Sequence, residues 1–477
     1  MSFVGMQPSV EFSSLAEDDR LVLFPPADDW SVGRDDREAL LPNAITPPPA
    51  LADTSKVRVA IVHEWLETYA GSESVLEQLL RCYPTADLFV VVDFMPKEHR
   101  GFLEGRTIRT SFIQRLPGAR RLFRQYLGLM PIAIEQHDLS GYDLIISSSH
   151  AVAKGVITGP DQIHISYVHS PMRYIWDLQH QYLKHAGLRR GLKAIYVRWL
   201  FGRLREWDVS SSHHVDHFIA NSEYIARRIK KNYRRDAAVI HPPVDVDRFM
   251  PGSRKDDFFL IACRFVPYKR VEVIVESFSQ QPNRRLIVVG DGPECACVRA
   301  AAHGAANIVF KGVVPRAELI DLMQRARAVM FAAEEDFGIT MVEAQACGTP
   351  VIAYGRGGAT DIVITDESEA PTGVLFHRQD PDAVTAAIEA FEIIEAKIKS
   401  EACRANALRF SQTRFQSEIH SFVDQALAKS WLYGEREAAL IEGAHEDVTT
   451  ATQSGADETQ DLADQVTALS PAYAAVQ

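Results

Sequence analysis

Short apolar runs and amphipathic stretches alternate along most of this chain. VRVAIV at residues 57–62 predicts a buried strand, and SVLEQLLRCY at residues 74–83 has helical spacing. Residues 63–73 between them are predicted to form a loop. Because the runs are rich in Val and Ile and alternate with helices, they predict a parallel sheet covered on both faces. Further runs of this first set lie at residues 87–92, 143–149, 163–169 and 217–222.

The alternation stops at HPPVDVDRF (residues 241–249), where a Pro pair and a charged turn predict a hinge between domains. It then resumes and predicts a second doubly wound domain. The runs of this second set lie at residues 258–265, 284–292, 307–313, 328–335, 350–355 and 372–376. Two long amphipathic helices are expected at residues 380–394 and 410–432, and the second is expected to cross back onto the first domain.

Composition and charge set the domain limits. The net charge is −12, but residues 1–55 hold 10 acids against 3 bases and residues 434–477 hold 9 against 1, so the rest is mildly basic. Both ends are poor in apolar residues that could offset their ordering entropy, and we expect disordered tails. The expected domains are residues 56–245 and 246–409, followed by the crossing helix at residues 410–433.

Other bulk features point to a cytoplasmic protein. No run of 18 apolar residues predicts a membrane-spanning helix, and the first residues lack the basic and apolar regions of a secretory signal. Six cysteines are scattered, and only Cys295 and Cys297 are close. No second Cys or His pair matches them, so isolated core thiols are favoured over a zinc site or a redox pair.

The residues with unusual chemistry follow the predicted strands. In open α/β sheets, ligands bind beyond the carboxyl ends of the strands. Two sheets that face one another would therefore gather such residues around one interdomain cleft. The residues placed in this way are Gly71, His169, Arg264, Gly290 and Glu335.

EEDFGITMVEAQACGTPVIA (residues 334–353) contains the strongest candidate site. Gly338 allows a sharp turn, and a helix that begins near Ile339 would point its free N–H groups and positive dipole end at an anion. Glu343 could then accept ribose hydroxyls and Glu335 sugar hydroxyls. Spacing alone leaves the alternative open that Glu335 is a dipole partner and Glu343 a surface acid.

Two glycine-containing motifs resemble known signatures but do not match them. The tripeptide DFG lacks the catalytic loop and strand lysine of a kinase. GDGPEC (residues 290–295) has Cys295 where the dinucleotide fingerprint has glycine, so Gly290 and Gly292 form either a structural turn or a turn that approaches a ligand.

Strand-end bases and histidines are further candidates. In CRFVPYKR (residues 263–270), Arg264 and Lys269 follow a buried strand and lie opposite the glycine turn. We interpret them as bases that neutralise a diphosphate, in preference to ordinary solvated surface bases. His169 follows a strand and precedes a proline, a position also common for an ordinary loop histidine. Weaker candidates of the same kind are His63, Glu64 and His150.

With these residues in place, the chain resembles a GT-B glycosyltransferase of the large retaining family 4, which uses nucleotide-sugar donors. The resemblance covers roughly residues 57–432. It rests on E-x7-E followed by A-x-A-C-G-T-P-V-I-A, together with R-F-x-x-x-K, V-V-G-x-G-P and V-D-V-D-R-F. HSPMRYIWDLQHQYL (residues 169–183) is similar to bacterial O-antigen and exopolysaccharide mannosyltransferases. The implied fold is two facing Rossmann-like domains.

The resemblance also implies roles. Arg264 and Lys269 would bind the donor diphosphate, and Glu343 would hold the ribose. Glu335 would contact the transferred sugar, and His169 matches the active-site histidine of the family. Further donor contacts are implied for Gly71, Gly290, Gly292, Val313 at the base, and the backbone at Phe337, Gly338 and Ile339. Ala70 stands where many relatives have a second glycine, which weakens the role of Gly71.

The implied reaction transfers a sugar with retention, by front-face attack through an oxocarbenium-like state. No D-x-D cluster suits Mg²⁺, so no metal or other cofactor is expected, and Arg264, Lys269 and the helix end would stabilise the leaving diphosphate. GDP-mannose is the expected donor. The alternatives are UDP-glucose, UDP-galactose or a rhamnose donor, a sugar-nucleotide epimerase, and a non-catalytic scaffold of the same fold.

Three basic segments suggest where the protein binds its acceptor. Residues 106–131 contain six Arg and no acid, residues 184–205 contain seven Lys or Arg and no acid, and residues 227–235 add more. Because aromatic and aliphatic residues are interleaved, an anionic inner-leaflet surface is a better partner than nucleic acid. We expect a peripheral protein on the inner face of the cytoplasmic membrane, with a polyprenyl-diphosphate-linked acceptor.

Overall fold

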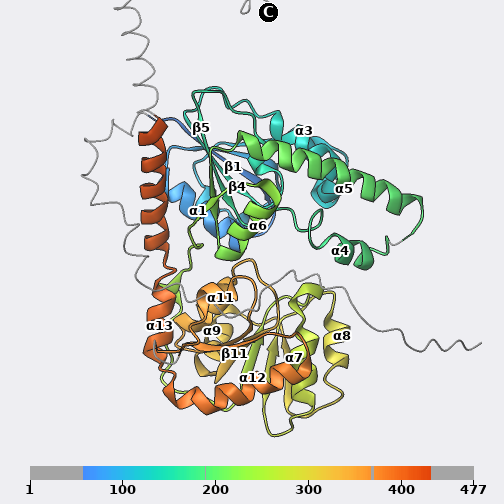
Figure 1. The fold of residues 1–477 in the computed structure, drawn as a ribbon, viewed down its shortest axis with the longest axis vertical. Coiled ribbons are helices and arrows are strands. Elements are labelled where there is room, and N and C mark those ends of the chain that lie inside the picture. The colour runs from blue at the N-terminus through green and yellow to red at the C-terminus, as the bar shows by residue number, and fades with distance from the viewer. Residues whose placement is uncertain (1–56, 189, 367–369, 431–477) are drawn as a thin grey trace, which may run out of the picture. The chain divides into compact units, whose positions relative to one another are not determined.

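The computed structural model describes residues 57–430, except residues 189 and 367–369. The tails predicted at residues 1–55 and 434–477 lie outside the described residues. The described chain forms two parallel sheets of seven and six strands (Figure 1). The predicted pair of Rossmann-like α/β domains is confirmed.

The first sheet has the order β3-β2-β1-β4-β5-β6-β7. Its central strand β1 pairs in parallel with β2 and β4. The strands are β1 (Val59–Leu66), β2 (Asp87–Asp93), β3 (Ile108–Thr110), β4 (Leu144–Ser149), β5 (Ile163–Val168), β6 (His217–Ala220) and β7 (Ala237–Val239).

Helices cover both faces of this sheet because alternate residues of each strand point to opposite sides. Val59 and Ile61 join a buried cluster with α1. Ala60 and Val62 join another cluster with α3 and α5. The helices are α1 (Gly71–Cys82), α2 (Ala119–Leu122), α3 (Met130–Glu135), α4 (Gln179–His185), α5 (Leu192–Ser211) and α6 (Glu223–Tyr233), and the 3₁₀ segment η6 (Phe123–Leu129) precedes α3.

The second sheet has the order β10-β9-β8-β11-β12-β13 and is also parallel. The strands are β8 (Phe259–Ala262), β9 (Leu286–Val289), β10 (Ile308–Gly312), β11 (Ala328–Phe331), β12 (Val351–Tyr354) and β13 (Gly373–Phe376). The helices are α7 (Val271–Ser279), α8 (Cys295–Ala300), α9 (Arg316–Arg325), α10 (Ile339–Ala346), α11 (Ala359–Ile362), α12 (Pro381–Ile394) and α13 (Ser400–Leu408).

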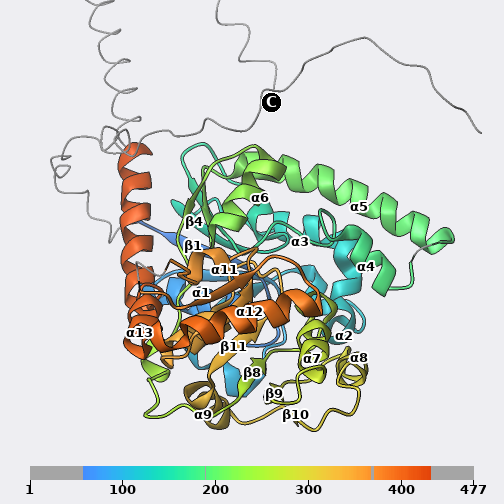
Figure 2. The same ribbon diagram turned by 60° about the horizontal axis from the view of Figure 1, so that its bottom comes forward.

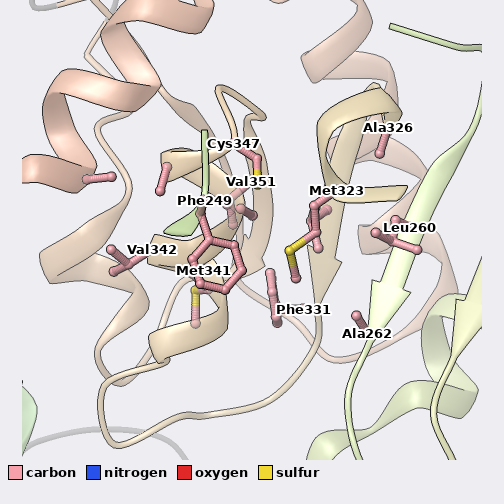
Figure 3. Close-up of a cluster of buried hydrophobic side chains, with 14 of the residues drawn as sticks. Phe249, Leu260, Ala262, Met323, Ala326, Phe331, Met341, Val342, Cys347 and Val351 are labelled. Atoms are coloured by element: carbon pink, nitrogen blue, oxygen red, sulfur yellow. The ribbon is translucent and has the colours of Figure 1, made fainter. Parts of the chain in front are cut away.

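Helix α10 is fixed by a tightly packed apolar cluster. Met341 and Val342 are fully buried, and they share this cluster with Phe249 and Phe331 (Figure 3). A well-packed core holds side chains in fixed positions. The residues just before α10 are thereby held in place at the carboxyl edge of the sheet.

Two stretches of chain pass between the sheets and are bound to each other. The Val244 N–H donates to the Phe410 carbonyl over 2.8 Å. Residues 412–430 then form a helix, the red one that continues from α13 in Figures 1 and 2. Its Phe415 and Ile419 are buried in the same cluster as Ile61 of β1.

Some predicted elements were wrong in detail. Residues 63–66, predicted as loop, complete strand β1, and α1 already begins at Gly71. The short strands β3 and β7 were not predicted, since each has three residues and neither is fully buried. All six cysteines are free thiols, but Cys297 is exposed and so is not a core thiol.

Candidate active site between the two sheets

Two adjoining cavities lie at the carboxyl ends of the strands. Cavity I, of about 600 Å³, is formed by the second sheet, and cavity II, of about 560 Å³, by residues of both sheets. They share Cys263, Arg264 and Thr340. The predicted site residues at cavity I are Arg264, Gly290, Gly292, Val313 and Glu343, and those at cavity II are Gly71, His169, Arg264, Lys269, Glu335, Phe337, Gly338 and Ile339.

Lys269 and Glu335 form an ion pair in cavity II. Lys269 leaves β8, and Glu335 leaves β11, the neighbouring strand. Burial alone would lower the pKa of Lys269, but Glu335 and Tyr268 outweigh burial, and the net shift is upward. The ammonium is therefore charged at neutral pH and is shared between Glu335 and any anion that enters the cavity.

Arg264 lies where the two cavities meet. Its side chain is exposed, and it lines both cavities. A guanidinium presents a planar fork of donors that suits two oxygens of a phosphate group. Arg264 is thus placed to contact a group that bridges the two cavities.

The predicted glycine turn and helix start at residues 338–339 lie where the sequence indicated. Gly338 has φ +105°, and α10 begins at Ile339. A Cβ on Gly338 would come within 2.4 Å of Met341 Cε, so a larger residue would meet both backbone strain and the packed core. The N–H groups of Ile339 and Thr340 precede the first hydrogen bond of α10, from the Met341 N–H to the Gly338 carbonyl, and the positive end of the helix lies at the cavity.

Phe337 contributes to the site through its backbone. Its side chain is buried and stacks on His241 at 5.4 Å between ring centroids. It also contacts the ring of Phe410. The side chain thus anchors the turn in the core, and the backbone of residues 337–338 forms part of the wall of cavity II.

Glu343 is separated from Glu335 by the start of α10. Its carboxylate lines cavity I and lies 3.0 Å from the Arg316 guanidinium. Burial raises the pKa of Glu343, although Arg316 opposes this shift. The carboxylate is neither an exposed surface acid nor part of the Lys269 pair.

Gly290 and Gly292 have a clear structural reason to be glycine. A Cβ would come within 1.9 Å of the Cys263 carbonyl oxygen at Gly290, and within 2.3 Å of the Phe265 carbonyl oxygen at Gly292. The two strand-end loops therefore pack backbone against backbone. Both glycines also line cavity I, together with Val313, whose side chain is 78% exposed.

Gly71 brings the first sheet's loop close to α10. A Cβ on Gly71 would lie 3.0 Å from Ile339 Cδ1. Ala70, which replaces a glycine of many relatives, uses its N–H to donate to Glu73 Oε2 over 2.9 Å at the start of α1. Gly71 thus lines cavity II at a place where little space remains for a side chain.

His169 belongs to a hydrogen-bonded group on the first sheet. Its Nε2 lies 2.9 Å from Ser148 Oγ, which also lies 3.2 Å from His63 Nδ1. His63 Nε2 lies 3.6 Å from Glu73 Oε1. Burial, together with His150 and His63, lowers the pKa of His169 to about 3. His169 is therefore neutral at physiological pH and serves as a hydrogen-bonding group.

Glu64 and His150 form a second pair beside it. His150 Nδ1 lies 2.9 Å from Glu64 Oε2. Burial would raise the pKa of Glu64, but His150 and backbone N–H groups hold it well below its usual range. Burial likewise opposes the protonated form of His150, but Glu64 outweighs it and raises the pKa of His150. Residues treated singly in the sequence, His63, Glu64 and His150, thus form one cluster.

The sequence reasoning missed Arg173 and Asp336. Arg173 lines cavity II and lies 3.2 Å from Asp336 Oδ1. Arg228 approaches the same carboxylate oxygen at 3.5 Å. Arg173 is four positions after His169 in a strand-end loop, a signal of the kind that singled out Arg264. These contacts join the first sheet's loops to the residue beside Glu335.

Two parts of the chain match models of known protein families. Residues 69–248 match the model of Glycosyltransferase Family 4, and residues 245–410 match that of Glycosyl transferases group 1. These are two glycosyltransferase domains of the GT-B fold. The predicted resemblance to a family 4 glycosyltransferase is confirmed at this level.

Curated relatives match part of the chain. The D-inositol 3-phosphate glycosyltransferase of Mycobacterium avium is 30% identical over 190 residues, which are 35% of this chain and 44% of that protein. That of Mycobacterium leprae (strain Br4923) is 30% identical over 224 residues, 41% of this chain and 51% of that protein. The chain thus spans about half of the length of these relatives.

Solved structures share the fold over most of the chain. Sucrose-phosphate synthase from Thermosynechococcus elongatus has a TM-score of 0.58 at 18% identity and covers 78% of this chain and 100% of its own. Anabaena Alr3699/HepE in complex with UDP has a TM-score of 0.55 at 17% identity, with 77% and 100% covered. At these sequence identities, the structural similarity is evidence for the fold alone.

Two further observations concern the described residues. None of the helices they form is long and apolar enough to cross a bilayer. Nor do they contain a group of three or more His, Cys, Asp or Glu side chains arranged to hold a metal ion. The prediction that no metal takes part stays a prediction.

Proposed function

We propose that this protein is a retaining glycosyltransferase that transfers a sugar from a nucleoside diphosphate sugar to a lipid-linked oligosaccharide acceptor in surface polysaccharide synthesis. GDP-mannose is the first candidate donor. The proposal rests on how the charged groups are distributed around α10. Arg264 lines both cavities, Lys269 and the start of α10 line cavity II, and the carboxylates of Glu335 and Glu343 belong to separate cavities.

This distribution of charged groups matches the parts of a nucleoside diphosphate sugar. The nucleoside would occupy cavity I, with the base near Val313 and the ribose hydroxyls on Glu343. The diphosphate would lie at Arg264, Lys269 and the first N–H groups of α10, where charge-assisted hydrogen bonds are strongest. The sugar would occupy cavity II beside Glu335 and His169.

The reaction follows from these positions. The bond between the sugar C1 and the diphosphate oxygen breaks, and the acceptor hydroxyl oxygen bonds to C1 on the same face. The proton of that hydroxyl passes to the leaving phosphate oxygen. Lys269 and Arg264 stabilise the charge that develops on the diphosphate, and Glu335 orients sugar hydroxyls. The neutral His169 donates or accepts a hydrogen bond at the sugar or the acceptor.

Support for mannose comes from residues 169–183. This segment resembles mannosyltransferases, and its His169 and Arg173 line cavity II, where the sugar would lie. Arg173 is held by Asp336, and Trp176 Nε1 donates to Asp208 Oδ2 over 2.8 Å, so the segment has a defined shape. The solved relatives whose descriptions include UDP or UDP-glucose make UDP-sugars the alternative donors.

The test uses three radiolabelled donors, GDP-mannose, UDP-glucose and UDP-galactose, each with and without a membrane lipid extract. We expect label to enter the lipid phase from GDP-mannose. Transfer from a UDP-sugar alone would refute the mannose assignment and retain the transferase. Conversion of a free UDP-sugar without lipid would instead indicate an epimerase.

A further inference from the structure

One helix of the first domain has an unpartnered apolar face. The side chains of Leu192, Ile195, Tyr196 and Trp199, in the first half of α5, are 86%, 64%, 58% and 60% exposed. Their spacing places them on one side of the helix. We call these four residues the α5 face. Single exposed apolar residues are common, but a contiguous group of this size marks an interaction site.

The α5 face is separate from the side by which α5 packs on the sheet. Ala194, Phe201 and Leu204 are buried, and Phe201 and Leu204 lie in the core cluster that covers β1. In both views the end of α5 that follows α4 extends beyond the strands of the first sheet (Figures 1 and 2). The α5 face is therefore not needed to hold the helix in place.

The segment that carries the α5 face is basic. Residues 184–205 contain seven Lys or Arg and no acid, and Lys193 on the first turn of α5 is exposed. The neighbouring segment η6 lies against α5, since a Cβ on Gly128 would be 3.2 Å from Leu200 Cδ1. The short helix α2 just before it adds the exposed bases Arg120 and Arg121.

We propose that the α5 face docks on a bilayer surface that contains anionic lipid. Tyr and Trp suit the boundary between head groups and acyl chains, because each has an apolar body and a polar tip. The surrounding bases add attraction to an anionic surface. This inference rests on the proposed function, because a lipid-linked acceptor would be presented at that surface.

Other occupants fit the charge and composition less well. A symmetric contact with a second copy would place two basic segments against each other. The acidic segment at residues 434–477 has complementary charge, but Tyr473 is its single aromatic residue, which is little to cover two aromatic and two aliphatic side chains. Nucleic acid would not require Leu192 or Ile195 to be exposed.

The experiment is flotation of the full chain with vesicles of phosphatidylcholine, with or without phosphatidylglycerol. We expect binding to the anionic vesicles, weakened by salt. The double variant Ile195→Ala/Trp199→Ala should bind at least about tenfold more weakly, because two inserted side chains are lost. The matched control is Ile393→Ala, which removes a side chain 80% exposed on α12 and should leave binding unchanged.

Several results would overturn the inference. These are equal binding to both vesicle types, no effect of the double variant, or a self-association that this variant abolishes. Vesicle binding by a chain that ends at residue 433, but not by the full chain, would show that the acidic segment covers the face. Calorimetric binding of GDP-mannose without lipid tests the proposed function separately, so a chain that binds donor and no vesicle contradicts only the docking.

Discussion

The two walls of cavity II are polar in different ways. The wall from the second sheet presents formal charge to the cavity, through Arg264 and the Lys269–Glu335 pair. On the wall from the first sheet, Arg173 is paired with Asp336 and His150 with Glu64, and the wall presents a neutral His169 fixed by Ser148. One wall is built to attract an anion, and the other to orient an uncharged group.

The difference shows how one cleft serves two parts of a reaction. A leaving diphosphate needs cations that are already in position, because moving charges into place during the reaction costs free energy. A sugar or acceptor hydroxyl needs a donor or acceptor of fixed direction. Substitutions on the second sheet's wall should therefore have larger effects than those on the first.

The largest effect is expected for Lys269→Ala. It removes a cation from the diphosphate site and leaves Glu335 without its partner, so kcat/KM should fall about 10³-fold or more. Steady-state transfer measures this, and Glu335→Ala should abolish transfer as well. Lys311→Ala breaks the exposed Lys311–Glu318 pair of 2.7 Å and should leave activity intact. Near-normal activity of Lys269→Ala would refute its role.

The next effect is expected for Gly338→Ala. The new Cβ would occupy a strained conformation and meet Met341, which displaces the start of α10. Affinity for the nucleoside diphosphate should weaken about 100-fold, as measured by calorimetry. Gly304 also has a positive φ, of +77°, but no atom lies within 4 Å of a Cβ there. If Gly304→Ala weakens binding equally, the effect is general strain and not displacement of the helix.

A smaller effect is expected for His169→Ala on the first sheet's wall. Because His169 orients a group and carries no charge, kcat should fall about 10- to 100-fold with little change in donor KM. His169→Asn should restore part of the rate. The contribution of His169 should also be constant from pH 5 to 8, since its pKa is about 3. A step in the pH profile that His169→Asn removes would contradict a neutral histidine.

The smallest effect concerns stability and a buried histidine of β5. Burial lowers the pKa of His164 to about 4, whereas an unfolded histidine has a pKa of about 6.5. Between these values the unfolded chain binds more protons, so stability is lost as the pH falls. The loss from His164 should reach about 2 kcal/mol at pH 5. Denaturant unfolding at pH 7.5 and 5 measures it, and His164→Gln should show a correspondingly smaller difference.

The sequence predicted the site residues on the second sheet better than those on the first sheet. Gly338 and the start of α10 at Ile339 are local features, because a glycine between a strand and a helix fixes the turn. The pairing of Lys269 with Glu335 is not local, because it depends on β8 and β11 being neighbours. On the first sheet, His63 lies opposite Ser148, 85 positions away, only through the register of β1 and β4.

The hydrogen bond between Val244 and Phe410 fastens together the two stretches that connect the sheets. Two connections pinned at one point act as a pivot, which resists sliding of one sheet past the other more than it resists a swing about that point. A covalent bridge at that pivot would leave the swing possible. A bridge between positions 71 and 339, which approach each other beside cavity II, would hold the two walls together and trap whatever the cavity holds.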